Sequence, residues 1–316
     1  MSRKKHTAAA DSIEGLDTEK SNLLSADLDI KSSLEIARII NAEDVKVAVA
    51  VERALPQIAQ AIDWISGALG SGGRVIYVGT GTSGRIAALD AAECPPTFNT
   101  SPKMVQFVIA GGPRALGLPI EADEDSFKLG TREIRKKRPT RKDVVVGIAA
   151  SGRTPFTIAA VAEARRVGAR TVAIVNNRDS PLAEAAALAI VLETGPEVVT
   201  GSTRMKAGTA QKMVLNMLST GAMVRLGHVY GNLMVNLRQK NSKLTERALI
   251  VLQRALNVDR ALARQLLRSA GNDLPVAIVM RLSGVDRKAA QKALQSVGGV
   301  RDAIAFAKAR ASGAKA

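Results

Sequence analysis

The spacing of hydrophobic and polar positions changes along this chain, and the changes mark out its elements. Within residues 33–69 apolar side chains recur every three or four positions, which predicts two amphipathic helices. Pro56 falls inside the second helical stripe, so we expect a kink or a break there. Residues 1–16 are small and polar, and we predict that they form a disordered lead-in.

The middle of the chain holds five short runs that are almost continuously apolar, as strands buried on both faces are. They cover residues 74–78, 104–109, 143–148, 171–175 and 188–192. Helical patterns separate most of them, at 85–92, 122–136, 155–167 and 181–186. This alternation predicts an α/β fold of three layers, with a five-stranded parallel sheet between helices.

The last third of the chain is helical throughout. A long helix rich in small residues is predicted for 205–226, and four amphipathic segments follow at 244–256, 258–269, 273–282 and 286–295. We therefore divide the chain into the lead-in, an α/β domain with N-terminal helices at 17–240, and a small C-terminal helical bundle at 241–316.

Composition excludes several classes of protein. Aromatic residues make up only 3% of the chain, which argues against recognition of nucleic acid by base stacking. No apolar run is long enough to span a membrane or to serve as a secretory signal. The single cysteine, Cys94, cannot form an internal disulfide, so we expect a reducing compartment, the cytoplasm.

The net charge of +16 suggests an anionic partner, either nucleic acid or a phosphorylated metabolite. Much of the charge lies in the first five residues, in 132–142 and in 308–315. We interpret most of it as solvated surface, because no nucleic-acid-binding motif accompanies it.

A glycine-rich turn follows the first predicted strand. Its sequence, Gly-Thr-Gly-Thr-Ser-Gly at 79–84, matches the G-x-G-x-x-G pattern of dinucleotide sites. Such sites also need an acidic residue at the end of the second strand, and residues 109–112 offer none. The hydroxyl groups of Thr82 and Ser83, with backbone N–H groups near Gly84, suit a phosphomonoester better.

A second turn of this kind, Ala-Ser-Gly-Arg-Thr-Pro at 150–155, follows the third predicted strand. Ser151 and Thr154 present hydroxyl groups where a helix begins, so each turn taken alone could be simple helix capping. Two such turns at strand ends of one parallel sheet would face one crevice, and together they favour ligand binding.

Longer segments carry a resemblance to a known family. Residues 18–22, 91–97, 147–155 and 200–212 resemble the signature blocks of the N-acetylmuramic acid 6-phosphate etherases, and the paired turns resemble those of the sugar isomerase (SIS) domain. The resemblance implies a lyase that cleaves the lactyl ether of this phosphosugar in amino sugar catabolism and peptidoglycan recycling, and it implies a homodimer. The related glucokinase regulatory protein binds phosphosugars without catalysis, so a non-catalytic regulator is the alternative.

The resemblance also implies a set of site residues. Glu93, before two prolines that we expect to end its helix, corresponds to the acid that protonates the departing lactate. Glu124 corresponds to a second carboxylate, although an acid near a helix N-terminus is favourable in any protein. Ser202, Arg204 and Lys206 begin the long helix, where they could either cap it or bind the anionic groups of the substrate.

Neither a metal nor a cofactor is expected. The chain has two histidines, His6 and His228, and neither forms a ligand cluster or a cysteine–histidine dyad with Cys94 in the sequence.

Overall fold

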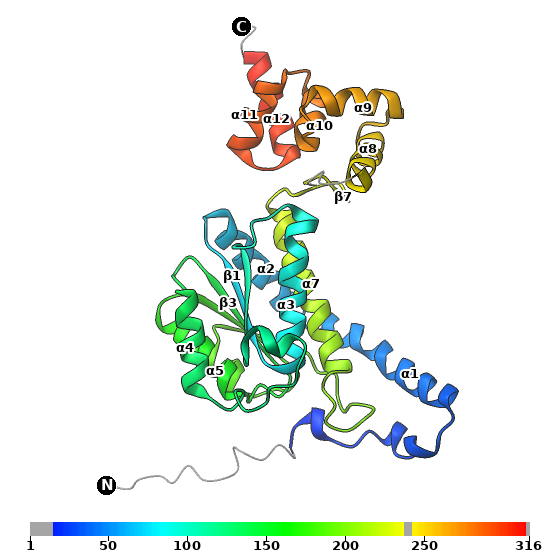
Figure 1. The fold of residues 1–316 in the computed structure, drawn as a ribbon, viewed down its shortest axis with the longest axis vertical. Helices are drawn as coiled ribbons and strands as arrows, with labels where there is room; N and C mark the ends of the chain where they lie inside the picture. Colours follow the sequence, from blue (N-terminus) through cyan, green and yellow to red (C-terminus); the bar gives the residue numbers. More distant parts are fainter. Residues whose placement is uncertain (1–14, 237–241, 314–316) are drawn as a thin grey trace. The chain divides into compact units, whose positions relative to one another are not determined.

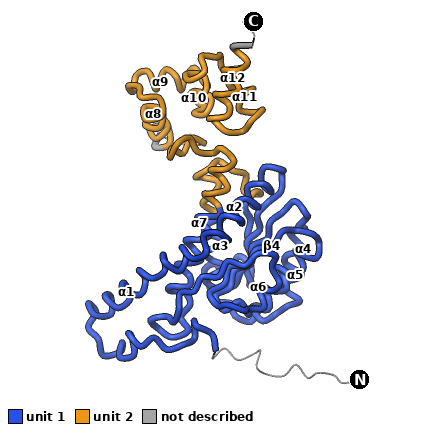
Figure 2. Tube along the Cα trace, turned by 180° about the vertical axis from the view of Figure 1, so that it is seen from behind, with its two compact units in different colours: residues 1–90, 105–218 blue, residues 91–104, 219–316 orange. Residues whose placement is uncertain are grey.

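The computed structural model describes residues 15–236 and 242–313 (Figure 1). Within them lie two compact units, coloured separately in Figure 2. Unit 1 falls within Met1–Asp90 and Val105–Leu218, and unit 2 falls within Ala91–Met104 and Ser219–Ala316. Residues 1–14, most of the predicted lead-in, lie outside the described residues, whereas Leu16 is buried. The predicted boundary at residue 240 remains a prediction.

Unit 1 is built on a parallel sheet of five strands in the order β2-β1-β3-β4-β5. Its strands are β1 (Val75–Gly79), β2 (Val105–Ile109), β3 (Val144–Ala149), β4 (Arg170–Val175) and β5 (Leu188–Val191). Every residue of β1 and β3 is buried, as expected for central strands with helices on both faces. The predicted five-stranded α/β fold is therefore confirmed, with strand ends within one residue of those expected.

Helices cover both faces of this sheet. In unit 1 they are α1 (Ser33–Glu52), α2 (Leu55–Gly70), α4 (Phe127–Lys137), α5 (Pro155–Arg166) and α6 (Pro181–Ala185), and α3 (Gly81–Phe98) and α7 (Lys206–Arg225) begin there. Side chains alternate between faces along β1. Ile76 packs with Phe156 of α5, whereas the hydroxyl of Tyr77 donates to Asp90 of α3 at 3.0 Å.

The predicted break near Pro56 is confirmed. Helix α1 ends at Glu52, and α2 begins at Leu55 with Pro56 in its first turn, where a missing N–H costs nothing. Ser32 and Glu35 form a capping box that fixes the start of α1. Three short 3₁₀ turns, Asp17–Glu19, Leu23–Ser25 and Leu28–Ile30, precede it.

The expectation that Pro95 and Pro96 end the helix that carries Glu93 was wrong. Helix α3 continues through both prolines to Phe98. A proline ring has a helical φ, and what it removes is its own N–H, so a helix can pass through it when packing supports the last turn. Cys94 and Phe98 are buried at this end of α3 and provide that packing.

Among the described residues, unit 2 contains the ends of α3 and α7, a short hairpin and five further helices. The hairpin joins β6 (Val229–Tyr230) to β7 (Leu233–Met234), and the helices are α8 (Ser242–Leu256), α9 (Arg260–Ser269), α10 (Leu274–Ser283), α11 (Arg287–Val297) and α12 (Val300–Gly313). The first four match the predicted segments; α12 was not predicted. None of the helices within residues 15–236 and 242–313 is long and apolar enough to span a bilayer.

Candidate active site

The two glycine-rich turns lie where the strand order of the sheet reverses. Strands β1 and β3 are neighbours, and from them the chain proceeds outward in opposite directions, to β2 and to β4. In open parallel sheets the carboxyl ends of such a strand pair bound a crevice that binds ligands. The first turn leaves β1 and the second leaves β3, so the sequence prediction that both face one crevice agrees with the topology.

The first turn brings the start of α3 close to the sheet. Gly81 has a φ of +47°, in the left-handed region that glycine tolerates. A Cβ atom at Gly84 would lie 2.6 Å from the side chain of Ile109 and 3.0 Å from the carbonyl of Gly79. The glycines therefore let the first N–H groups of α3, beside the half-buried Thr82, approach the crevice.

Ser83 makes a different contact from the one expected of a phosphate donor. Its hydroxyl donates to the side-chain carbonyl of Gln211 on α7 at 2.8 Å, and the amide of Gln211 donates to Asn176 at 3.0 Å. All three side chains are buried. The hydroxyl hydrogen of Ser83 is thus committed within the chain, and its backbone N–H remains as the group for a phosphate.

The second turn keeps its hydroxyl groups available. Thr154 occupies the position before α5 but caps no helix N–H in the described structure. Ser151 accepts a bond from the N–H of Arg153 at 3.2 Å, which leaves its own hydroxyl hydrogen to donate elsewhere. Gly152, with a φ of +67°, allows this turn to pack against Ser180. Capping, the alternative that the sequence left open, does not account for Thr154.

Glu124 lies between the two turns. Its carboxylate accepts a hydrogen bond from the hydroxyl of Thr80, at the end of β1, at 3.0 Å. Its backbone carbonyl accepts from the N–H of Phe156, in the first turn of α5, at 3.0 Å. Partial burial raises the pKa of Glu124 above its usual value, although the bond from Thr80 opposes the shift. The structure therefore holds a carboxyl of raised pKa in contact with Thr80 of the first turn and with Phe156, just after the second.

The start of α7 packs against the first turn. A Cβ atom at Gly208 would lie 3.3 Å from the methyl group of Thr82, so a small residue there permits the close approach. The buried carboxylate of Glu197 accepts from the N–H groups of Lys206 and Ala207 at 3.0 and 2.9 Å. Glu197 thus occupies the capping role that the sequence offered to Ser202, which is half-buried nearby in the chain, while Arg204 is exposed.

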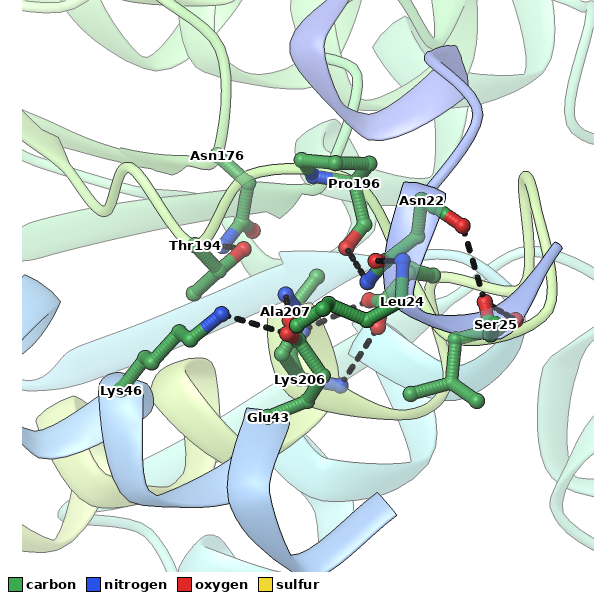
Figure 3. Close-up of polar contacts among 12 residues, drawn as sticks. Asn22, Leu24, Ser25, Glu43, Lys46, Asn176, Thr194, Pro196, Lys206 and Ala207 are labelled. Atoms are coloured by element: carbon green, nitrogen blue, oxygen red, sulfur yellow. Dashed lines mark hydrogen bonds and ion pairs between the residues drawn. The ribbon is translucent and has the colours of Figure 1, made fainter. Parts of the chain in front are cut away.

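Lys206 points into the protein rather than outward. Its ammonium group donates to Glu43 of α1 at 2.6 Å, and both side chains are 2% exposed (Figure 3). Lys46 also pairs with Glu43. Breaking a buried ion pair leaves an uncompensated charge, so this pair fixes α1 to the start of α7. Sequence analysis proposed Lys206 as a substrate ligand and could not identify Glu43 as its partner.

The N-terminal segment contacts the second turn. The amide of Asn177 donates to the hydroxyl of Thr18 at 3.1 Å and to the carbonyl of Ala150 at 2.9 Å. Farther along, Asn22 donates to the carbonyl of Pro196 and Ser25 to that of Val198 (Figure 3). The 18–22 block, whose place the sequence left open, is therefore part of the scaffold behind the second turn.

Glu93 is an exposed residue on α3. It lies 11 positions beyond Thr82, which is roughly 17 Å along a helix that rises 1.5 Å per residue. The two side chains therefore leave α3 at points about three helical turns apart.

Gln211, which sequence analysis did not single out, is expected to be a stabilising residue. Replacing it with leucine would leave the hydroxyl of Ser83 and the side-chain carbonyl of Asn176 buried without these hydrogen bonds, so we expect the free energy of unfolding to fall by about 2 kcal/mol or more. Thr209→Ala, at an exposed position on the same helix, should change it by less than about 0.5 kcal/mol. Urea denaturation measures both; equal stabilities for the two variants would contradict the role of Gln211.

Histidine, cysteine and acidic side chains do not gather into a possible metal site of three or more ligands within the described part of the chain. Nδ1 of His228 lies 3.0 Å from the carbonyl oxygen of Phe98, which accepts from it in the tautomer that carries a hydrogen there, and burial lowers the pKa of the imidazole.

The chain is similar to known proteins over most of its length. Residues 57–165 match the model of the glucokinase regulatory protein N-terminal SIS domain, and residues 135–221 match that of the SIS domain. The chain is 49% identical over 282 residues to the N-acetylmuramic acid 6-phosphate etherase of Aeromonas hydrophila, covering 89% of this chain and 95% of that protein. It is 55% identical over 262 residues to the etherase of the same name from Symbiobacterium thermophilum, covering 83% and 87%.

A solved structure supports the fold. The phosphoheptose isomerase from Francisella tularensis superposes with a TM-score of 0.50 at 17% identity, covering 61% of this chain and all of that one.

Proposed function

The chain belongs to the family of the N-acetylmuramic acid 6-phosphate etherases, and on that premise we propose that it cleaves the D-lactyl ether of this phosphosugar. The products are N-acetylglucosamine 6-phosphate and D-lactate, and the reaction belongs to the recycling of cell-wall amino sugars. The observation that carries the proposal is the position of Glu124 between two turns suited to a phosphate. Incubation with N-acetylmuramic acid 6-phosphate and an assay for free D-lactate tests it.

The phosphate binds at the two turns. The hydroxyls of Thr82, Ser151 and Thr154 donate to its oxygens, and so do the first N–H groups of α3, up to that of Ser83; the N–H of Gly84 donates to the carbonyl of Thr80 instead. Because both turns belong to one sheet, they fix the phosphate at one end of the substrate and direct the sugar carbons toward Glu124. Arg204, exposed at the start of α7, is available for the lactyl carboxylate, and Ser202 lies beside it in the chain.

The reaction proceeds by elimination. In the open-chain sugar the C2 proton lies next to the C1 aldehyde, which acidifies it, and the lactyl oxygen on C3 is a β leaving group. Glu124 takes the C2 proton, the C3–O bond breaks, and a protonated carboxyl donates to the departing oxygen. Water then adds at C3 of the unsaturated aldehyde, and a proton returns to C2.

The two carboxyl groups must differ in protonation for this chemistry. Burial raises the pKa of Glu124, and a carboxylate whose conjugate acid has a higher pKa is a stronger base. A base must be ionised, so the activity that depends on Glu124 should fall as the pH drops through its raised pKa. Glu93 is assigned the acid role that protonates lactate.

Glu93 acts from a second chain in this proposal. Its separation from Thr82 along α3 is too long for one substrate, so the site is completed by Glu93 of the partner subunit in a homodimer. A stripe of exposed apolar side chains on one face of α1, formed by Leu34, Val45 and Val49, offers a surface for association. Lys206 contributes indirectly, through its ion pair with Glu43, by holding α1 and α7 together.

Subunit complementation tests this arrangement. Co-expressing the Glu93→Gln and Glu124→Gln chains gives mixed dimers in which one of the two sites has both intact carboxyls. About half of the dimers are mixed under random pairing, so we expect about a quarter of the wild-type activity. Each variant alone, assayed at the same concentration, is the control. A mixture no more active than the two separate variants would contradict a shared site.

The proposed elimination reaction also bears on the cofactor requirement, and Cys94 bears on the compartment. We propose a cytoplasmic enzyme that requires neither metal nor nucleotide, because the substrate's own aldehyde supplies the acidification that a metal or cofactor supplies elsewhere. The buried thiol of Cys94 is compatible with a reducing compartment.

A further inference from the structure

A pocket lies at the amino ends of the strands, whereas the two turns follow their carboxyl ends. It has a volume of about 380 Å³ and opens at the amino ends of the strands, beside the first residues of β3 and β4. Its polar and aromatic lining comes from Trp64 and Ser71 near α2, from Arg141 and Lys142 before β3, and from Arg170 of β4. Ligand pockets begin at about 300 Å³, so it is large enough for a small metabolite.

Trp64 gives this pocket a flat apolar wall. It is the one tryptophan of a chain that is poor in aromatic residues, and it is half-buried. The guanidinium group of Arg170 lies 5.4 Å from the centre of its ring, within the range of a cation–π contact. The contact orders both side chains at the pocket wall.

The pocket also has an unbalanced positive charge. Arg141, Lys142 and Arg170 are exposed, and no carboxylate within residues 15–236 and 242–313 forms an ion pair with any of them. The carboxylate in the lining, Asp143, is 2% exposed and is bonded to groups other than these three cations. Its oxygens accept from Arg74, at 2.8 Å from the guanidinium, and from the N–H of Thr140 at 2.8 Å. Asp143 therefore does not neutralise the three cations.

We propose that this pocket binds a phosphomonoester attached to a flat ring, such as a nucleoside monophosphate. The ring takes the place of the exposed Arg170 guanidinium against Trp64, since stacking on one aromatic side chain contributes about 1–3 kcal/mol, and the phosphate meets Arg141, Lys142 and the displaced Arg170. A cyclic sugar phosphate shares this chemistry to a lesser degree, because a saturated ring stacks less well. The site is separate from the crevice at the carboxyl ends of the strands.

The single tryptophan makes the test direct, because fluorescence excited at the indole reports from this pocket alone. We expect AMP to change the fluorescence of the full chain saturably, and more tightly than inorganic phosphate. Arg141→Ala combined with Lys142→Ala should weaken AMP binding by about tenfold or more. The control, Lys288→Ala with Lys292→Ala on α11, removes the same charge at exposed positions and should bind as the unaltered chain does.

Three other results of this experiment would each support or overturn part of the proposal. Saturation by N-acetylglucosamine 6-phosphate rather than AMP, lost in the Arg141 and Lys142 variant, would support the phosphate contacts and overturn the flat ring. Inorganic phosphate binding as tightly as AMP would overturn the role of Trp64. The absence of saturation at millimolar concentrations, or equal affinity in both double variants, would overturn the site.

Discussion

Replacing Glu93 with glutamine is expected to lower kcat for lactate release by about a hundredfold or more. Glutamine keeps the size of the side chain but cannot donate a proton to the departing oxygen, and general acid catalysis contributes 10²–10⁴-fold. Binding of the phosphosugar should persist, because the phosphate contacts belong to the two turns. Steady-state kinetics measures the first effect and isothermal titration calorimetry the second.

The matched control for this substitution is Glu246→Gln, at an exposed position on α8. It removes the same charge by the same change and should leave kcat unaltered. If Glu93→Gln turned over nearly as fast as Glu246→Gln, Glu93 would be an ordinary surface residue of α3 and the assignment of the acid would fail. Loss of binding together with turnover would place Glu93 in substrate recognition instead.

Removing the 6-phosphate from the substrate should have the larger effect on kcat/KM. N-acetylmuramic acid lacks the dianion to which Thr82, Ser151 and Thr154 would donate, and bonds from several donors to a charged group contribute about 1.5–3 kcal/mol each. We therefore expect kcat/KM to fall by about a thousandfold or more. Comparison of the two sugars under identical conditions measures it.

A variant of the second turn links this loss to the residues proposed. Ser151→Ala should reduce kcat/KM for the phosphorylated sugar and barely alter the residual rate with the unphosphorylated one, since the missing donor has no acceptor there. Comparable values of kcat/KM for the two sugars in the unaltered protein would remove the phosphate site from the account.

The sequence predicted the sheet well because its strands carry a simple signal. A strand buried on both faces has to be apolar throughout, and the runs around β1 and β3 are. The two turns were also predictable, since a run of glycine, serine and threonine directly after a buried strand is typical of a turn that leads into a helix. Helix α12 was missed because its sequence is rich in alanine and charged residues and shows little amphipathic contrast.

The contacts that organise the site could not be read from the sequence. Glu43 and Lys206 are 163 residues apart, and their ion pair depends on how α1 packs against α7. In the same way, nothing near Ser83 in the chain indicates that its hydroxyl donates to Gln211, 128 residues away. Periodicity reports which face of an element is buried, but it does not report which buried polar groups meet.

The resemblance to the family supplied Glu93 and Glu124, which composition and spacing would not have distinguished from other acids. The structure adds a local reason for Glu124, namely the hydroxyl of Thr80 and the raised pKa. For Glu93 it adds a constraint, which is the length of α3 between Glu93 and Thr82. From this length we inferred that Glu93 acts in the site of the partner subunit.

The most direct test of the account is to follow oxygen and hydrogen through the reaction. With N-acetylmuramic acid 6-phosphate in ¹⁸O-labelled water, elimination followed by addition places the label in the C3 hydroxyl of N-acetylglucosamine 6-phosphate. Lactate keeps the ether oxygen and stays unlabelled, and in deuterated water the sugar gains deuterium at C2. Mass spectrometry of both products shows which of them carries the isotope and at which position. Label in the 2-hydroxyl of lactate, with C2 still fully protonated, would show attack on the lactyl carbon and contradict the roles given to Glu93 and Glu124.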